Sequence, residues 1–156
     1  MLKNFLKYSF LSNHQLGFLP GRSTTQQCLY LSDKWVRYLS YGQSVGAVFM
    51  EFHKAFDKVW HSGLLHKLAI LGLDAGAIDC LRDYLSGRTL SERVGCEISN
   101  FYPVTAGVPR SFHLGSVLFL VLISDVPSES PSSTELYAAD ALLHSTLSST
   151  TDIEEL

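Results

Sequence analysis

Hydrophobic residues in the first third of the chain change from a helical spacing to an uninterrupted apolar run. Apolar side chains recur every three to four residues over 29–39, which predicts a helix. Ser23 and, three residues later, Gln26 form a capping box that begins this helix, and Gly42 can end it. Ahead of the helix, residues 1–22 form a basic, aromatic lead-in that ends in a turn.

The segment SVGAVFMEF (44–52) has no charged residue before Glu51, which predicts a buried strand with one carboxylate near its end. A carboxylate there costs free energy unless it is paired, hydrogen-bonded or bound to a metal ion. A strand end that already faces water would need none of these. Both explanations of Glu51 stay open at this point.

The middle of the chain predicts two short helices and a hairpin. The first helix covers 61–71, and the second begins after Asp74 and ends at Gly87. Residues 89–105 then predict a hairpin whose turn falls at 97–100. These segments contain no linker that would divide the chain into separate domains.

The last third begins with a Gly-Val-Pro turn at 107–109, followed by a strongly apolar helix over about 113–124. A Ser/Pro-rich loop at 127–133 precedes two short strands on either side of Asp140. The predicted strands are 135–139 and 142–146. A second capping box at 151–154 opens a helix that the sequence does not complete, so we expect a truncated domain.

Two of the predicted strands carry acids at their ends, Glu51 and Asp140. We expect these strands to lie side by side in one sheet. Acids brought together from distant positions commonly hold paired Mg²⁺ ions for phosphoryl transfer, because magnesium prefers hard oxygen ligands.

Composition narrows the class of protein. The chain has 156 residues, 46% of them hydrophobic and 17% charged, which is typical of one globular domain. The longest apolar run, 117–123, is shorter than the roughly 20 residues of a membrane helix, so we expect it in the core. Lys3 and Lys7 interrupt any apolar stretch of a signal peptide, and we therefore expect an intracellular protein without a membrane partner.

Charge is distributed unevenly along the chain. The net charge is −3, yet residues 1–60 carry +4 and residues 61–156 carry −7. The basic part could face phosphate groups, whereas the acidic part could do so only with metal ions. Possible RNA contacts in the basic part are Lys3, Lys7, Arg22, Lys34 and Arg37.

The cysteines and histidines do not indicate a metal cluster. Cys28, Cys80 and Cys96 are far apart, and we interpret them as reduced, partly buried thiols. His61 and His66 are five residues apart, so they do not share a helix face in the way an i, i+4 pair does.

Five blocks carry recognisable motifs: QLGFLPGRST (15–24), VFMEFHKAFD (48–57), DYLSGR (83–88), GVPRSFHLG (107–115) and YAAD (137–140). Their order and spacing resemble the reverse-transcriptase domain of non-LTR (LINE-like) retrotransposons. In that family the blocks correspond to a fingers motif, the first palm motif, a segment after the palm helices, the nucleotide-site turn and the tyrosine–alanine–double-aspartate hairpin.

The resemblance implies an α+β fold, a partial right-hand polymerase with an antiparallel palm sheet packed on helices and without a thumb. The single partial domain 1–156 would comprise a fingers-like part (1–43), a palm-like core (44–148) and the start of a truncated helix (149–156). The implied activity is RNA-directed DNA synthesis on an RNA template and a DNA primer. The implied cofactor is a pair of Mg²⁺ or Mn²⁺ ions.

The chain departs from the family at the metal-binding positions. Glu51 stands where the family has an aspartate, and one added methylene moves its carboxylate by roughly 1.5 Å. Ala139 replaces the first hairpin aspartate and cannot bind a metal, while Asp140 matches the second. The implied catalytic and metal-binding set is thereby reduced to Glu51 and Asp140, and we expect no productive metal binding.

The implied substrate contacts are partly kept. Phe56 fits the position under the nucleotide sugar, and Lys54 and Ala55 fit the backbone beside the triphosphate. An ordinary core aromatic and a solvated lysine are equally consistent with Phe56 and Lys54. Asp57 also matches the family, and we expect it to act in a turn or a helix cap.

The remaining implied contacts lie in the fingers motif and the nucleotide-site turn. Arg22 is kept, whereas Leu19 replaces a usual arginine. Pro109 is kept, but residues 110–112 are Arg-Ser-Phe where the family usually has Gln-Gly-Ser. The larger side chains would obstruct a turn that approaches the incoming nucleotide.

These features predict a retrotransposon-derived reverse-transcriptase domain that is inactive alone. Other hypotheses stay open: a residual polymerase that works with Mn²⁺, a non-catalytic RNA- or protein-binding module, and a decaying copy of the element. A palm without its covering parts would also expose apolar surface, and we expect self-association through it.

Overall fold

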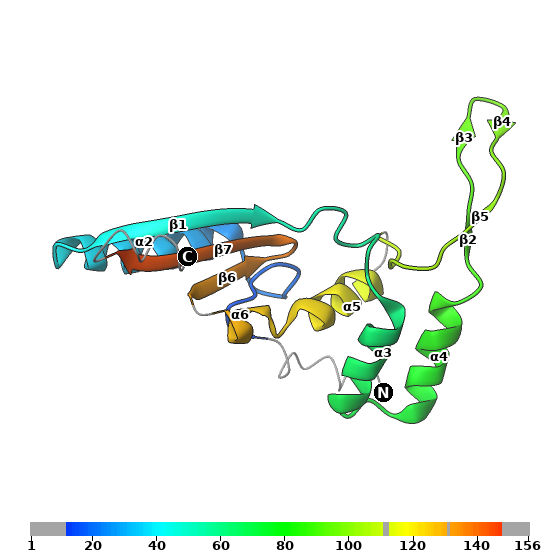
Figure 1. Cartoon of the computed structure of the whole chain (residues 1–156), viewed down its shortest axis with the longest axis horizontal. Coiled ribbons are helices and arrows are strands. Elements are labelled where there is room, and N and C mark those ends of the chain that lie inside the picture. Colours follow the sequence, from blue (N-terminus) through cyan, green and yellow to red (C-terminus); the bar gives the residue numbers. More distant parts are fainter. Residues whose placement is uncertain (1–11, 111–112, 131, 148–156) are drawn as a thin grey trace. The chain divides into compact units, whose positions relative to one another are not determined.

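The computed structural model in Figure 1 describes residues 12–110, 113–130 and 132–147. The chain folds into two compact units, and we describe each by itself. The sheet unit contains the described residues of 11–53 and 123–156, and the turn unit contains those of 54–122. Helices and antiparallel strands occur together, which confirms the mixed α and β character expected from the sequence.

The sheet unit is built on three strands in the order β1-β7-β6, and both pairings are antiparallel. The predicted β6–β7 hairpin is confirmed, with its two-residue turn at 138–139. Part of the loop predicted at 127–133 is instead helical, since Pro127 lies in the first turn of α6. The elements of the unit are α2 (Thr24–Ser40), β1 (Ser44–Glu51), α6 (Val126–Glu129), β6 (Ser133–Tyr137) and β7 (Asp140–Leu147).

Helix α2 begins at the predicted capping box. The backbone N–H of Gln26 donates to Ser23 Oγ at 3.3 Å, and the backbone N–H of Ser23 donates to Gln26 Oε1 at 3.1 Å. The Trp35 ring packs edge-on against His144 of β7, with ring centroids 6.0 Å apart. Helix α2 therefore covers the sheet face on which the His144 side chain lies.

Strand β1 is present as predicted, but the prediction that it is buried is wrong. Phe49 is 76% exposed, and Val48 and Met50 are also exposed. β1 is an edge strand of this sheet, so one of its long sides has no strand beside it. A lack of charge indicated a strand correctly, but it did not reveal how many neighbours the strand has.

A short segment before α2 extends the sheet on its other side. The backbone N–H of Leu16 donates to Leu136 O at 3.0 Å, and the N–H of Leu136 donates to His14 O at 2.8 Å. These bonds form a parallel bridge between Gln15 and Leu136 of β6. The first motif block (15–24) thus begins beside the β6–β7 hairpin.

The turn unit contains α3 (His61–Ile70), α4 (Ala75–Leu85) and most of α5 (His113–Ile123). All three were predicted, and Asp74 caps α4 by accepting a hydrogen bond from the Ala77 N–H. Helices α3 and α4 pack side by side in Figure 1. The buried run of α5 confirms the expectation that this apolar segment lies in the core; its residues are Leu118, Phe119, Leu120, Val121 and Ile123.

A long hairpin follows α4, but its turn lies at Gly95-Cys96 and not at 97–100 as predicted. The Ser-Asn pair at 99–100 suggested a turn, whereas the Ser99 N–H in fact donates to Glu92 O inside the hairpin. The paired strands are β2 (Thr89–Leu90) with β5 (Tyr102–Pro103), and β3 (Arg93–Val94) with β4 (Glu97–Ile98).

Two further expectations concern exposure and membranes. The three cysteines are free but exposed, so the prediction of partly buried thiols is wrong. Among the helices of the described residues, none has the length and apolar character needed to span a bilayer. The capping box predicted at 151–154 lies outside the described residues.

Candidate functional site

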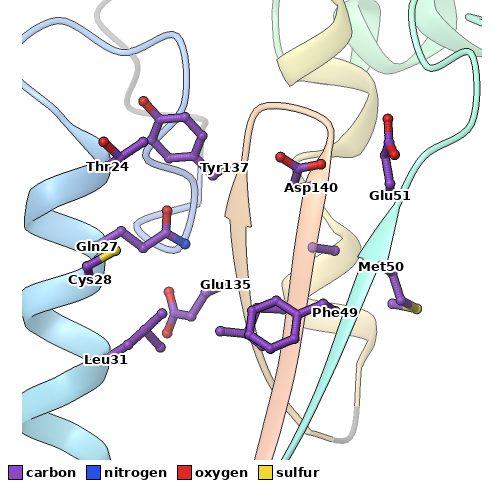
Figure 2. A pocket seen from close by; sticks show the side chains of 12 residues that line it. Thr24, Gln27, Cys28, Leu31, Phe49, Met50, Glu51, Glu135, Tyr137 and Asp140 are labelled. Atoms are coloured by element: carbon purple, nitrogen blue, oxygen red, sulfur yellow. The ribbon is translucent and has the colours of Figure 1, made fainter.

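The carboxylates of Glu51 and Asp140 lie at neighbouring strand ends, as predicted. The two residues are direct partners in the β1–β7 register. The Phe52 N–H donates to Ala139 O at 2.9 Å, so the adjoining pair Glu51–Asp140 is a non-hydrogen-bonded pair, in which side chains come closest. Figure 2 shows both carboxylates at the same end of the sheet. Two acidic residues from distant parts of the sequence are therefore neighbours there.

The hairpin that should complete a metal site offers no third ligand. Its turn consists of Ala138, at φ 55°, and Ala139, whose side chain is a methyl group. Within the described residues, no group of three or more His, Cys, Asp or Glu side chains is placed to hold a metal ion. The residues present therefore do not fit the two-metal centre that the sequence resemblance implies.

The backbone of this hairpin is nevertheless held in place by Gln15. The Gln15 Oε1 accepts hydrogen bonds from the Gly17 N–H at 2.8 Å and from the Ala138 N–H at 3.0 Å. Its Nε2 donates to Ala138 O at 3.4 Å. Gln15 is 1% exposed, so these bonds satisfy a buried amide. Sequence reasoning did not identify this role, although Gln15 opens the first motif block.

A cavity of about 440 Å³ opens between α2 and the sheet, next to the Glu51–Asp140 pair (Figure 2). Its walls are mostly apolar, but Gln27 and Glu135 reach it as buried polar side chains. The Glu135 Oε1 lies 3.1 Å from Nδ1 of His14. Neither Gln27 nor Glu135 was recognised from the sequence, because burial of a polar residue depends on packing between distant segments.

In the turn unit, the Gly-Val-Pro turn at 107–109 is attached by backbone hydrogen bonds to residues 56–59. The Gly107 N–H donates to Val59 O at 2.9 Å, and the Val108 N–H donates to Phe56 O at 2.8 Å. Gly107 has φ 90°, and a Cβ at this position would lie 2.7 Å from the backbone oxygen of Asp57. Glycine is therefore required here both for its backbone angle and for the close approach of two chain segments.

Two side chains converge on the carbonyl of Gly107. Arg88 Nη2 donates to this oxygen, and His61 Nε2 lies 2.8 Å from it. Arg88 ends the third motif block, and His61 begins α3. Neither had a predicted role, and both contact the same carbonyl oxygen of the turn.

Arg110 has two partners within the turn unit. Its Nη2 donates to Asp57 Oδ2 at 2.6 Å, and its guanidinium carbon lies 6.0 Å from the centroid of the Phe56 ring. Both side chains of the ion pair are more than half exposed. Asp57 lies in the turn at 53–58, as expected, where its N–H donates to Lys54 O at 2.9 Å, and its side chain forms this ion pair. Ser111 and Phe112 lie outside the described residues.

The other predicted substrate contacts are distributed over both units. Lys54 is exposed with φ 53°, Ala55 follows it, and the Phe56 ring packs on buried Phe119 with centroids 4.9 Å apart. The pairing of the two phenylalanines fits the core explanation of Phe56 without testing a contact with sugar. Pro109 lies in the turn unit beside Arg110, and exposed Arg22 lies in the sheet unit just before α2.

The basic residues that could face RNA are partly engaged with the protein itself. Arg37 forms an ion pair with Asp33 at 2.8 Å, and Lys34 Nζ lies 5.6 Å from the centroid of the Tyr30 ring. Lys3 and Lys7 lie outside the described residues.

One histidine of the sheet unit is buried in an unusual way. His144 is 1% exposed, and neither of its ring nitrogens has a hydrogen-bond partner among the described residues. Burial, with smaller effects of Lys34 and His14, lowers the pKa of His144 from 6.5 to about 4. The imidazole is therefore neutral at pH 7.

Comparison with known proteins agrees with the motif blocks. Residues 1–154 match the family described as Reverse transcriptase (RNA-dependent DNA polymerase). The chain is 36% identical over 129 residues to the RNA-directed DNA polymerase from mobile element jockey of Drosophila melanogaster, covering 83% of the chain and 14% of the relative. It is 35% identical over 117 residues to the "Probable RNA-directed DNA polymerase from transposon BS" of the same species, covering 75% of the chain and 13% of the relative.

The jockey polymerase of Drosophila funebris is 30% identical over 116 residues, which cover 74% of the chain and 12% of that relative. The chain thus spans only a small part of these curated relatives. With a family match over nearly its whole length, the chain belongs to the reverse-transcriptase family, among the RNA-directed DNA polymerases of non-LTR retrotransposons.

Proposed function

We propose that this chain is a reverse-transcriptase domain segment that has kept the hairpin and turn backbones of the family but does not catalyse nucleotide transfer. In this proposal, 1–43 is the fingers-like part and 44–148 the palm-like core. The observation that carries the proposal is Ala139, which occupies a two-residue turn held by Gln15 and presents only a methyl group.

The chemistry explains why one methyl group would matter so much. Reverse transcriptases generally use divalent metal ions, which activate the attacking oxygen and stabilise the leaving group. Glu51 and Asp140 bring two carboxylates to the sheet edge, but no third ligand group joins them in the described residues. Two facing carboxylates also repel each other when no cation lies between them.

A segment exchange tests the proposal without depending on the length of this chain. The jockey polymerase would carry residues 15–147 of this chain in place of its own segment, and primer extension on an RNA template would be measured with Mg²⁺. We expect extension to fall to background. Extension at the rate of the unaltered jockey enzyme would contradict the proposal.

Two repaired versions of the exchanged segment separate the effect of the carboxylates from the effect of the turn. One variant restores the carboxylates (Glu51→Asp, Ala139→Asp), and a matched variant restores only the turn (Arg110→Gln, Ser111→Gly, Phe112→Ser). We expect the carboxylate repair to recover activity and the turn repair alone to recover none. Activity of the unrepaired exchange with Mn²⁺ would favour the residual-polymerase hypothesis instead.

A second candidate is a protein-contact role, favoured by the exposed apolar residues of α2. Leu29, Val36 and Leu39 are each at least 60% exposed and repeat at intervals of seven and three residues. Such a stripe is typical of helix pairing. In this second proposal the partner is another copy of the chain, and sedimentation velocity should show association that Leu29→Gln with Val36→Gln abolishes.

RNA binding through the basic N-terminal part stays a prediction. Affinity for single-stranded RNA should fall steeply between about 50 and 200 mM salt if several basic residues contact phosphates. Charge reversal at Arg22 and Lys34 should then reduce the slope. An unchanged slope would contradict RNA binding through this region.

A further inference from the structure

We propose that the cavity between α2 and the sheet binds a small planar aromatic cation, such as an arylamidine. The cavity lies wholly within the sheet unit. The inference goes beyond the proposed function, because it concerns a ligand for the apolar space beside the acids and does not depend on whether the chain polymerises nucleotides.

The size and walls of the cavity suit a small aromatic molecule. Its volume of about 440 Å³ is within the range of small-molecule sites. Leu31 of α2 and Phe49 of the sheet both line it (Figure 2), and Leu142 of β7 is also part of its wall. The Phe49 ring is 76% exposed, so an aromatic ligand that packs against it would remove apolar surface from water.

The charge of the lining selects a cation. Three carboxylates line the cavity, those of Glu51, Glu135 and Asp140, and none of the lining residues is Lys, Arg or His. The Glu135 side chain is only 3% exposed, and Figure 2 shows its carboxylate directed toward α2. Its Oε1 already lies 3.1 Å from His14 Nδ1, so the second carboxylate oxygen, Oε2, is the one offered to a ligand. An anion would meet repulsion here, whereas a delocalised cation could pair with Glu135 in a partly dehydrated space.

Gln27 supplies an observation independent of the acids. Its side chain is 8% exposed, and in the described part of the chain its amide has no hydrogen-bond partner. Figure 2 shows the amide extending from α2 into the cavity. The amide can therefore hydrogen-bond a ligand that enters the cavity, with its oxygen accepting and its nitrogen donating.

An amidinium group on a flat apolar ring meets these three requirements together. Its N–H groups can donate to the Glu135 carboxylate and to the Gln27 Oε1, while the ring packs on Phe49 and Leu142. A planar cation also interacts favourably with an aromatic face. A neutral or anionic ring of the same shape would satisfy the apolar walls alone.

The test is a titration of the whole chain with benzamidine, neutral benzamide and anionic benzoate, followed by calorimetry and by intrinsic fluorescence. We expect benzamidine to bind saturably, benzamide to bind at least about tenfold more weakly, and benzoate not to bind. Equal binding of benzamidine and benzamide, or no binding of benzamidine, would overturn the proposal.

Two variants locate the binding. Glu135→Gln should weaken benzamidine at least about tenfold, and Gln27→Leu should weaken it about threefold or more. Glu97→Gln removes the same charge from the exposed hairpin of the turn unit and should leave the affinity unchanged. If circular dichroism shows that Glu135→Gln does not fold, Gln27→Leu with Phe49→Ser carries the test. Affinities unchanged in the cavity variants, or equally reduced by Glu97→Gln, would overturn the assignment.

Discussion

The turn unit and the sheet unit differ in how some of their polar side chains are paired. In the turn unit, the Gly107 carbonyl lies within hydrogen-bonding reach of both Arg88 and His61, and Arg110 pairs with Asp57. In the sheet unit, the ring nitrogens of His144 and Trp35 are buried without partners among the described residues. A replaced residue in the turn has therefore found a local partner, whereas the sheet keeps groups that destabilise it.

The two units can also be compared by the motif block that each contains. In both units, hydrogen bonds hold the backbone of a motif block: a glycine turn in one, a hairpin bound by Gln15 in the other. What has changed is the side chain presented at each. The comparison teaches that backbone support need not depend on the side chains that depart from the family pattern, because the supporting residues lie outside those positions.

We predict the largest loss of stability for a substitution of Gly107 in the turn unit. Gly107→Ala should destabilise the protein by about 4 kcal/mol, because it adds a strained φ and a clash with the Asp57 backbone. Gly72→Ala is the matched control, since Gly72 also has positive φ but open space around it, and it should cost only about 1 kcal/mol. Urea unfolding measures both, and equal losses would contradict the close approach.

The second prediction concerns the pH dependence caused by His144. Its folded pKa, about 4, lies below the unfolded value of 6.5, so the unfolded state binds more protons between these values. Stability should therefore fall by about 3 kcal/mol as the pH drops from 7 to 4. His144→Leu should remove this part of the slope, and the exposed-residue variant His66→Gln should not. An unchanged slope in His144→Leu would show that other groups cause the acid sensitivity.

A smaller loss of stability should follow when the β6–β7 hairpin loses its hydrogen bonds to Gln15. Gln15→Leu removes the acceptor of the Gly17 and Ala138 N–H groups and should cost about 2 kcal/mol. Gln43→Leu, at an exposed position, serves as the control in thermal unfolding. If both variants lose the same small amount, the hairpin does not depend on Gln15.

The smallest effect belongs to the exposed ion pair of the turn unit. A double-mutant cycle with Arg110→Gln and Asp57→Asn should give a coupling of about 0.5 kcal/mol that disappears in 1 M salt. A coupling of several kcal/mol would mean that this pair, and not the glycine turn, organises the unit.

The sequence predicted local structure well because its signals are local. The capping box at Ser23, the Asp74 cap and the apolar run of α5 each depend on a few neighbouring residues, and all three are present. The pairing of Glu51 with Asp140 was also predicted, since both acids end strands that share a sheet. The helices, the pairing of β1 with β7 and the two acids of the site could therefore be predicted without a structure.

Predictions that depended on burial failed more often. Whether a residue is buried depends on which distant segment covers it. This applies to the exposed β1 and the exposed cysteines, and to the buried side chains of Gln15, Gln27, Glu135 and His144. No pattern within a short window contains that information. The hairpin turn was misplaced for a related reason, because Gly95 competed with a second turn signal at 97–100.

The antiparallel pairing of β1 with β7 has a consequence for synthesis on the ribosome. β1 emerges about 90 residues before its partner β7, and the whole turn unit is translated in between. At about 5–20 residues per second, the strand and its exposed Phe49 wait for several seconds without the neighbour that completes their hydrogen bonds. During that interval the nascent chain presents an unpaired apolar edge, which makes β1 the segment most in need of a chaperone.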